Sequence, residues 1–395
     1  MKAFKLKINR TQLPKLIEEL ELPEVSILLG SRQVGKTHLL KELENVAKLS
    51  HKKTAYFNLE IPQDLLMFQK SDLDLFNMLT GSGFDVVFID EFHYLPNASK
   101  LFKAIYDSEH AVKIVVSGSS SIEIHKHLKE SLAGRRLVTR IFPLSLEEYK
   151  QAYPELDEQD VFNQYILYGG LPGLIHINNP EEKIRYLQDM LETYIQKDIK
   201  SLIKEENIRA FNMLIYLLMQ NQGQLVSVHS LANDIGVSSP TVEKYLSILE
   251  ATYVLYPLHS YSKNLGNELK KSRKYYFYDL GMRNAVLKDF RLEKRPDLGA
   301  IYETFVCHLL TSQLLPNQEL KFWRTRQGEE IDFVLLENRV PSIIEVKANN
   351  AVIPKAFQRF VTSYTDTQRG IVYTMQASPT QYCGDVPISY IPFYA

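Results

Sequence analysis

Eight consecutive residues near the N-terminus, Gly30–Thr37, have the types and spacing to bind a nucleotide phosphate. They fit the phosphate-loop pattern of Gly, four residues, Gly, Lys and then Ser or Thr. The glycines allow a tight turn whose backbone N–H groups point at phosphate oxygens. We expect Lys36 to reach the terminal phosphates and Thr37 to bind Mg²⁺. A glycine-rich turn with a chance Lys-Thr pair is the alternative.

The segments on either side supply the strand and the helix that such a loop needs. The largely apolar run Val25–Leu29 predicts a buried strand, and Leu39, Leu40, Leu43 and Val46 recur at helical spacing. A helix N-terminus beside the loop adds partial positive charge where phosphates would bind. The order strand, loop, helix therefore argues against a chance match.

Two acids follow another predicted strand and complete an ATP site. The apolar run Val86–Ile89 ends in Asp90 and Glu91. Asp90 is expected to hold Mg²⁺, and Glu91 to polarise the water that attacks the γ-phosphate. The residues predicted to surround the nucleotide are Gly30, Ser31, Arg32, Gln33, Val34, Gly35, Lys36, Thr37, His38 and Asp90. We therefore predict a site for ATP with Mg²⁺.

Two more groups are candidates to act on the γ-phosphate. A predicted strand at Lys113–Val116 runs into serines 117 and 119–121, of which Ser119 is the favoured γ-phosphate sensor. A turn that caps the next helix is an equally good interpretation. Arg135 follows Gly134, and an arginine supplied by the same chain or a neighbour stabilises transition-state charge. The second case would need a homo-oligomer, and solvated surface charge is the simpler account.

A second set of chemically capable residues lies near the C-terminus. Asp332 and Glu345 are predicted on neighbouring strands, and Lys347 shares a face with Glu345 because side chains alternate along a strand. This is the Asp…(Asp/Glu)-x-Lys pattern of metal-dependent nucleases, which Glu303 on an amphipathic helix would complete. The two acids would bind Mg²⁺ to polarise a phosphodiester, and Lys347 would orient or deprotonate water. Chance, or a nuclease fold without catalysis, are the alternatives.

The middle of the chain has the pattern of a DNA-binding module. The run Leu231–Leu246 is typical of a helix-turn-helix, and segments 253–258 and 275–278 would form a β-wing. Contacts from such a wing to phosphates would be independent of sequence. The residues predicted to contact nucleic acid are Thr241, Lys244, Lys270, Lys271, Arg273 and Lys274. Glu243 and Glu250 on the second helix leave a protein–protein or interdomain role open.

The motifs taken in order resemble a broad prokaryotic family of AAA-like P-loop ATPases with a C-terminal domain of the type called DUF4143. The segments that carry the resemblance are Gly30–Thr37, Val86–Glu91, Val115–Ser121, Leu132–Arg136, Phe142–Ser145, Tyr168–Pro172, Tyr194–Asp198, Tyr276–Gly281 and Glu345–Lys347. His38 departs from it, since such proteins more often have a second Thr or Ser there. The resemblance implies ATP binding and leaves the biological role open.

Composition fits a multidomain soluble protein. The 395 residues are too many for one ordinary core, and 45% are hydrophobic and 24% charged. The formal net charge of −1 means that a nucleic-acid partner must be argued from local patches. Cys307 and Cys383 lack metal-ligand spacing. Neither a signal peptide nor a membrane span is recognisable, so we expect a cytoplasmic protein without a membrane partner.

We therefore expect an α/β multidomain fold. Residues 1–145 would form an AAA-like P-loop ATPase domain with a parallel sheet, residues 146–205 a helical connector or lid, residues 206–290 a winged-helix domain and residues 291–395 a restriction-endonuclease-like PD-(D/E)xK domain. One hypothesis is an ATP-dependent enzyme that acts on DNA through a Mg²⁺ nuclease. The other is an ATPase switch that binds DNA or a protein partner, with a non-catalytic nuclease-like domain.

Overall fold

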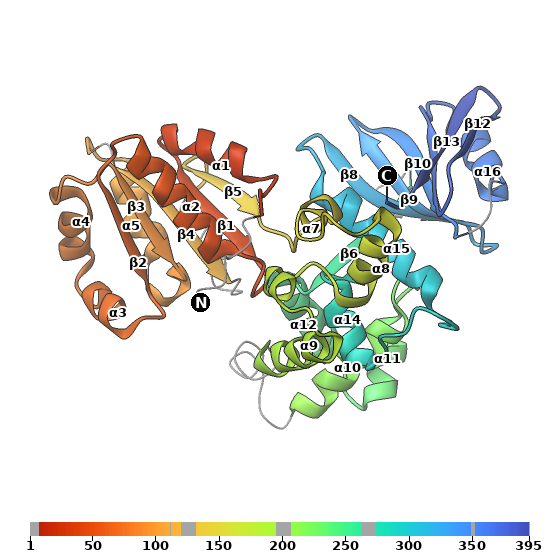
Figure 1. Cartoon of the computed structure of the whole chain (residues 1–395), viewed down its shortest axis with the longest axis horizontal. Coiled ribbons are helices and arrows are strands. Elements are labelled where there is room, and N and C mark those ends of the chain that lie inside the picture. Colours follow the sequence, from red (N-terminus) through yellow and green to blue (C-terminus); the bar gives the residue numbers. More distant parts are fainter. Residues whose placement is uncertain are drawn as a thin grey trace. The chain divides into compact units, whose positions relative to one another are not determined.

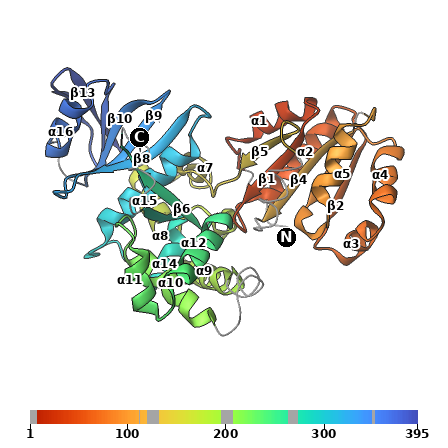
Figure 2. The same cartoon turned by 180° about the vertical axis from the view of Figure 1, so that it is seen from behind.

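The chain divides into two compact units. The computed structural model describes residues 8–110, 112–119, 132–194, 207–262, 273–348 and 352–394. The first unit runs to Leu144 and includes the later segments Leu171–Gly173 and Ile248–Val254, and the second unit contains the rest. Figures 1 and 2 show the chain from opposite sides. Within the described ranges no helix has the length and apolar character that a membrane crossing requires.

The first unit is built on a five-stranded parallel sheet in the order β2-β3-β4-β1-β5. Its strands are β1 (Val25–Gly30), β2 (Thr54–Asn58), β3 (Val86–Asp90), β4 (Lys113–Ser119) and β5 (Arg136–Arg140). Every residue of β1 and β3 is buried, as expected for central parallel strands with both faces covered. The parallel sheet predicted for this region is thus confirmed.

Helices cover both faces of that sheet (Figure 1). They are α1 (Leu13–Glu18), η1 (Glu19–Glu21), α2 (Lys36–Leu49), α3 (Pro62–Phe68), α4 (Asp72–Gly81), η2 (Phe92–Tyr94) and α5 (Ala98–Tyr106). Phe102 of α5 and Leu79 of α4 pack with Ile27 and Val87 in one apolar cluster. Helix α2 contacts β1 to β4 without joining that cluster, so it covers the opposite face.

The second unit contains an eight-stranded mixed sheet in the order β12-β13-β11-β10-β9-β8-β6-β7. Its strands are β6 (Leu255–Ser260), β7 (Lys274–Phe277), β8 (Gln318–Arg324), β9 (Glu330–Glu337), β10 (Val340–Val346), β11 (Gly370–Thr374), β12 (Ser378–Cys383) and β13 (Val386–Pro392). Strands β6 and β7, predicted as a wing, pair antiparallel. Strand β6 also pairs with β8 through His259 and Ser260, so the predicted wing continues into the C-terminal sheet.

The remaining helices surround this sheet or connect to it. They are α7 (Leu146–Lys150), α8 (Glu158–Tyr168), η3 (Pro172–His176), α9 (Pro180–Tyr194), α10 (Ile208–Gln220), α11 (Val228–Ile235), α12 (Ser239–Ala251), α14 (Leu280–Leu287), α15 (Leu298–Ser312) and α16 (Lys355–Ser363). Ser227 caps α11 and Gly236, with φ of 71°, ends it. The order α11, turn, α12, β6, β7 is that expected of a helix-turn-helix with a wing, and the winged-helix assignment stays a prediction.

One buried carboxylate joins two glycine motifs of the second unit. Asp279 caps α14 by accepting the N–H of Met282 at 2.9 Å, and it also accepts the N–H of Gly170 at 2.8 Å. Gly169 lies so close that a Cβ there would clash with the Asp279 carboxylate. A Cβ on Gly281 would likewise clash with a backbone carbonyl. Close packing therefore explains why both segments contain glycine.

Candidate functional site

The phosphate loop leaves β1 at Gly30 and enters α2 at Lys36. Gln33 and Gly35 have positive φ angles of 63° and 96°, which give the loop its tight turn. The buried Lys36 ammonium donates to the carbonyls of Gly30 at 2.9 Å and Ser31 at 2.8 Å. Phosphate oxygens are charged and therefore stronger acceptors than these carbonyls. The loop thus fits a nucleotide phosphate.

An arginine that precedes the loop in the sequence fixes the loop backbone through hydrogen bonds. The Arg10 guanidinium donates to the carbonyls of Val34 and Phe142, both at 2.8 Å. Gly30 is restricted from the same side, because a Cβ there would clash with the carbonyl of Ile141. The sequence did not single out Arg10, since it belongs to no motif and its partner Phe142 lies 132 residues away.

Asp90 lies at the same edge of the sheet as the loop, because β1 and β3 are parallel and both end there. It is fully buried. Its Oδ1 accepts the Ser117 hydroxyl, and its Oδ2 accepts the Tyr56 hydroxyl at 3.1 Å. Burial and the Asp90 charge raise the pKa of Tyr56 well above its usual range, so the phenol keeps its proton. Two hydroxyl donors therefore orient the carboxylate.

Glu91 and Ser119 were predicted to act near the γ-phosphate, and the structure describes the side chain of Glu91 only. Glu91 adopts φ of 56°, and its carboxylate lies 3.2 Å from Nδ1 of His93. Its role as the base stays a prediction. Ser119 ends β4 beside Gly30, and its side chain lies outside the part that the structure describes. Ser117, two residues earlier, is the serine that contacts Asp90. The two serines share a face of β4, and Ser117 is the one level with Asp90 because Val116 pairs with Ile89.

The other loop residues differ in exposure. Thr37 and His38, in the first turn of α2, are exposed, as is Gln33. Arg32 is partly buried, with its guanidinium 3.6 Å from Glu60. Thr37 and Asp90 as Mg²⁺ ligands would need phosphate oxygens and water to complete a coordination shell. Their metal-binding role therefore depends on bound nucleotide and stays a prediction.

The prediction that Arg135 acts on the γ-phosphate of its own chain is wrong. Arg136 pairs with Val25 at the start of β1, so Arg135 lies at the sheet edge opposite Gly30. A six-residue strand separates these edges by about 20 Å. Arg135 instead donates from Nε to Asp107 at 2.6 Å. A contribution to a neighbouring copy stays a prediction.

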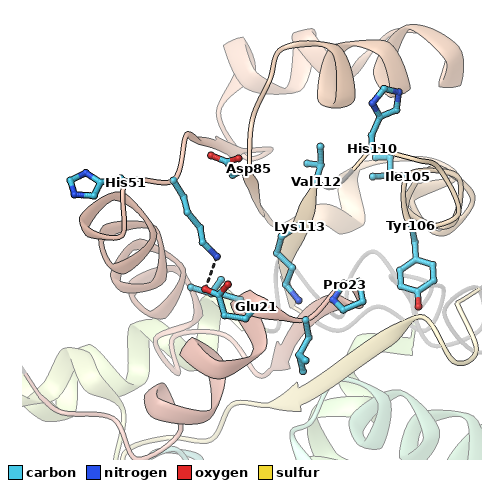
Figure 3. Close-up of a pocket in the computed structure, with 12 residues that line it drawn as sticks. Glu21, Pro23, His51, Asp85, Ile105, Tyr106, His110, Val112 and Lys113 are labelled. Atoms are coloured by element: carbon cyan, nitrogen blue, oxygen red, sulfur yellow. Dashed lines mark hydrogen bonds and ion pairs between the residues drawn. The ribbon is translucent and has the colours of Figure 1, made fainter.

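A cavity of about 430 Å³ opens at this opposite edge of the first unit (Figure 3). Its lining includes His51, Lys52, His110 and Lys113. The Lys113 ammonium donates to a backbone carbonyl, and burial lowers its pKa to about 8. None of the residues predicted to bind nucleotide lines the cavity, so it is separate from the phosphate loop.

The structure brings the predicted C-terminal residues together from three elements. Glu303 lies on α15, Asp332 on β9 and Glu345 on β10. The Asp332 N–H donates to the Glu345 carboxylate at 3.4 Å, and Asp332 Oδ2 accepts the N–H of Val346 at 2.9 Å. Lys347 Nζ lies 2.8 Å from Glu345 Oε1. The nuclease-like spacing in the sequence therefore corresponds to one buried cluster.

Crowding in this cluster makes its acids hold protons. Burial and the nearby Asp332 charge raise the pKa of Glu303 to about 7 and that of Glu345 to about 8. Burial also raises the pKa of Asp332. The cluster therefore carries less negative charge near neutral pH than its carboxylates suggest.

The prediction that Lys274 faces nucleic acid is wrong. Its side chain is 1% exposed, and its ammonium lies 3.1 Å from Glu303 Oε1 and 2.5 Å from Glu330 Oε1. Lys274 begins β7 with this side chain toward α15 and β9 rather than solvent. The ammonium therefore lies against Glu303, which was predicted to complete the nuclease pattern, and close enough to the predicted Mg²⁺ ligand Asp332 to feel its charge.

The other predicted nucleic-acid contacts are partly described. Lys244 on α12 and Arg273 before β7 are exposed, and Thr241 is half-buried. Lys270 and Lys271 lie outside the described residues. Contact with nucleic acid therefore stays a prediction. Among the described residues, Lys244 and Arg273 are the exposed cations that could make it.

A divalent metal does not fit the C-terminal cluster as it stands. Over the ranges that the structure covers, no group of three or more His, Cys, Asp and Glu side chains has the arrangement to hold a metal ion. Lys274 already supplies a cation to Glu303 and Glu330. The predicted metal ligands Asp332 and Glu345 are close together without forming a complete metal site.

Three domain families match successive parts of the chain. The AAA domain family matches residues 23–150, a domain of unknown function (DUF8612) matches residues 159–293, and a domain of unknown function (DUF4143) matches residues 298–394. The first match contains the phosphate loop and Asp90. The DUF4143 match contains Glu303, Asp332, Glu345 and Lys347, whereas Lys274 lies in the DUF8612 match.

Relatives that are similar over most of this chain occur in bacteria and archaea. Uncharacterized protein Rv2008c of Mycobacterium tuberculosis is 27% identical over 86% of this chain and 74% of its own. Uncharacterized protein MJ1544 of Methanocaldococcus jannaschii is 25% identical over 84% and 76%. AMPPCP-bound DnaA from Aquifex aeolicus is 16% identical over 60% of this chain and 85% of its own, with a TM-score of 0.33. The parallel sheet and the phosphate loop agree with the two domain matches, which together are those of an AAA-like P-loop ATPase with a C-terminal DUF4143 domain.

Proposed function

We propose that this chain binds and hydrolyses ATP at the Gly30–Thr37 loop. The observation that carries the proposal is the buried Lys36 ammonium, held by two loop carbonyls at the sheet edge where Asp90 also lies. Lys36 would bind the terminal phosphates, and Thr37 with Asp90 would hold Mg²⁺. When bound, Mg²⁺ supplies charge neutralisation of the phosphate oxygens.

The neighbouring residues have positioning roles in this proposal. Glu91 would orient the attacking water and accept its proton. Ser117 and Tyr56 hold the Asp90 carboxylate in one orientation through their hydroxyl groups. Arg10 fixes the loop backbone at Val34, which keeps the N–H groups of the turn directed toward the phosphates.

The ATPase proposal is tested by phosphate release and nucleotide binding in three single variants. Lys36→Ala should abolish both, whereas Glu91→Gln should bind ATP and release phosphate at least tenfold more slowly, within the range for loss of a general base. Lys48→Ala is the matched control, because Lys48 is an exposed lysine on the same helix. Unchanged hydrolysis in Lys36→Ala, with Lys48→Ala also normal, would show that the loop is not the catalytic site.

We favour the hypothesis that ATP binding and hydrolysis operate a switch that binds DNA or a protein partner. In this hypothesis the nuclease-like cluster is not catalytic. The presence of Lys274 among the acids supports this choice. A Mg²⁺ nuclease is the second candidate, supported by the convergence of Glu303, Asp332, Glu345 and Lys347.

The two outputs are separated by DNA cleavage and DNA binding. Plasmid and single-stranded DNA are incubated with Mg²⁺ or Mn²⁺, with and without ATP, using the parent chain and Asp332→Ala. Cleavage that depends on Asp332 would establish the nuclease and exclude the switch-only proposal. For binding, Lys244→Ala should lower the slope of log affinity against log salt by about one if this lysine contacts a phosphate.

A further inference from the structure

Seven charged side chains form the C-terminal cluster of the second unit, in which Lys347 and Arg324 are 45% and 38% exposed and the other five are more buried. The acids are Glu303, Glu330, Asp332 and Glu345, and the cations are Lys274, Arg324 and Lys347. They come from α15 and from four strands of the eight-stranded sheet, or directly follow one of them. The cluster therefore contains four acids and three cations.

We propose that the Lys274 ammonium is the resident cation of this nuclease-like cluster and takes the place of a divalent metal ion. The inference rests on the non-catalytic output favoured above and identifies its cause. It makes no use of the ATP site of the first unit.

The contacts of Lys274 are those of a built-in counter-ion. Its side chain is 1% exposed, and the ammonium contacts carboxylates from two elements, Glu303 on α15 and Glu330 on β9. The ammonium also lies over the face of the Phe322 ring, with Nζ 5.4 Å from its centroid. The nearby Asp332 adds a third negative charge that stabilises the ammonium. A lysine that interacts only with solvent would show none of these contacts.

One carboxylate oxygen of Glu303 is already engaged by two donors. Glu303 Oε1 accepts both the Lys274 ammonium at 3.1 Å and the Tyr276 hydroxyl at 2.5 Å. On the neighbouring strand, Asp332 Oδ2 accepts the N–H of Val346. A metal ion that bound through these two oxygens would displace their donors, and leaving a buried donor unpaired is unfavourable.

The charge balance identifies what Lys274 replaces. With Lys274 present, the four acids exceed the three cations by a single charge, which one retained proton neutralises. Without Lys274 the excess would be two negative charges, the charge that one divalent cation neutralises. Adding such an ion while Lys274 remains would leave the cluster with one excess positive charge and place the ion beside the buried ammonium, which is unfavourable.

The test is Mn²⁺ binding to the nucleotide-free full chain, measured by electron paramagnetic resonance. We expect the parent chain to show no Mn²⁺ site that Asp332→Asn removes. Lys274→Met and Lys274→Gln should each gain one such site, with at least tenfold tighter Mn²⁺ binding than the parent, and Asp332→Asn should abolish the gain. Lys355→Met, at an exposed lysine of the same unit, is the control and should bind Mn²⁺ as the parent does.

A second measurement on the parent chain does not depend on the Lys274 variants folding. Lys274 should resist acylation by a water-soluble amine reagent in the folded chain, both without Mn²⁺ and in millimolar Mn²⁺, as read by mass spectrometry. Exposed Lys244 reports the extent of the reaction. Labelling of Lys274 that appears on adding Mn²⁺ would mean that a metal displaces it, and the inference would fail.

Two Mn²⁺ results would also overturn the inference. One is an Asp332-dependent site in the parent chain, and the other is folded Lys274→Met and Lys274→Gln chains that both gain no site. Neither touches the ATPase proposal, which fails only through the Lys36 and Glu91 variants. A chain that lacks ATPase activity but shows the expected Mn²⁺ pattern would retain this inference.

Discussion

Replacing Gly169 by alanine should destabilise the second unit severely. Gly169 ends α8 with φ of 76° and ψ of −172°, a backbone region that is populated almost only by glycine. Its missing side chain also leaves room for the Asp279 carboxylate, with which a Cβ would clash. The substitution therefore strains the backbone and displaces a fully buried acid at the same time.

The magnitude follows from these two effects. The backbone strain costs about 1–3 kcal/mol. A displaced Asp279 loses its hydrogen bonds to the N–H groups of Gly170 and Met282, each worth about 1.5–3 kcal/mol for a charged acceptor. Reduced freedom of the unfolded chain returns at most about 1 kcal/mol. The lower limits combine to a loss of about 3 kcal/mol in the free energy of unfolding.

Urea unfolding followed by tryptophan fluorescence measures this loss in the correct unit. The chain has one tryptophan, Trp323, which is buried in the second unit. Gly299→Ala is the matched control, because Gly299 lies in α15 and a Cβ there would meet nothing within 4 Å. We expect Gly299→Ala to be neutral or to stabilise by up to about 1 kcal/mol.

Two results would refute this reasoning. A loss of less than about 1 kcal/mol for Gly169→Ala would show that neither the strain nor the clash is present. The other comes from a double-mutant cycle with Asp279→Ala, which removes the carboxylate that the new Cβ would meet. The cost of Gly169→Ala should be smaller in that background, and equal costs in both backgrounds would exclude the clash.

Three further predictions concern the two charged sites. Arg10→Ala should weaken binding of a fluorescent ATP analogue about tenfold, measured by titration, because the hydrogen bonds to Val34 in the loop and to Phe142 behind it are lost, each worth about 0.5–1.5 kcal/mol. Ser117→Ala should lower the melting temperature and slow phosphate release by removing a buried donor to Asp90, and an unchanged rate would exclude this positioning role. The second unit should be less stable at pH 8.5 than at pH 5.5 by the Trp323 assay, because Glu303 and Glu345 hold protons more tightly when folded, with pKa values of about 7 and about 8 against an ordinary 4.5. Glu345→Gln should flatten that dependence.

The features that the sequence predicted well are those that depend on short runs of neighbouring residues. The phosphate loop and the strand that ends in Asp90 each follow from spacing alone, and their common sheet edge follows from the parallel order of strands. The convergence of Asp332, Glu345 and Lys347 was likewise visible as alternation along predicted strands.

The features that sequence missed depend on partners far along the chain. Lys274 reads as one more basic residue in a basic loop, and only the fold places Glu303 and Glu330 around it. Arg135 has an arginine-finger sequence context, but the pairing of β5 with β1 places it at the wrong edge. Choosing between Ser117 and Ser119 required the register of β4, which a serine-rich run does not reveal.

The pairing of β6 with β8 has a consequence for dividing the chain into pieces. The matched families meet between residues 293 and 298, whereas the hydrogen bonds of the sheet cross that boundary from His259 and Ser260 to Lys321 and Phe322. A fragment cut there would expose the unpaired edge of β6 or of β8, which is a template for pairing with another chain. Neither family segment is therefore a self-sufficient folding piece, and fragments that keep β6 and β8 together should stay monomeric where the separated halves associate.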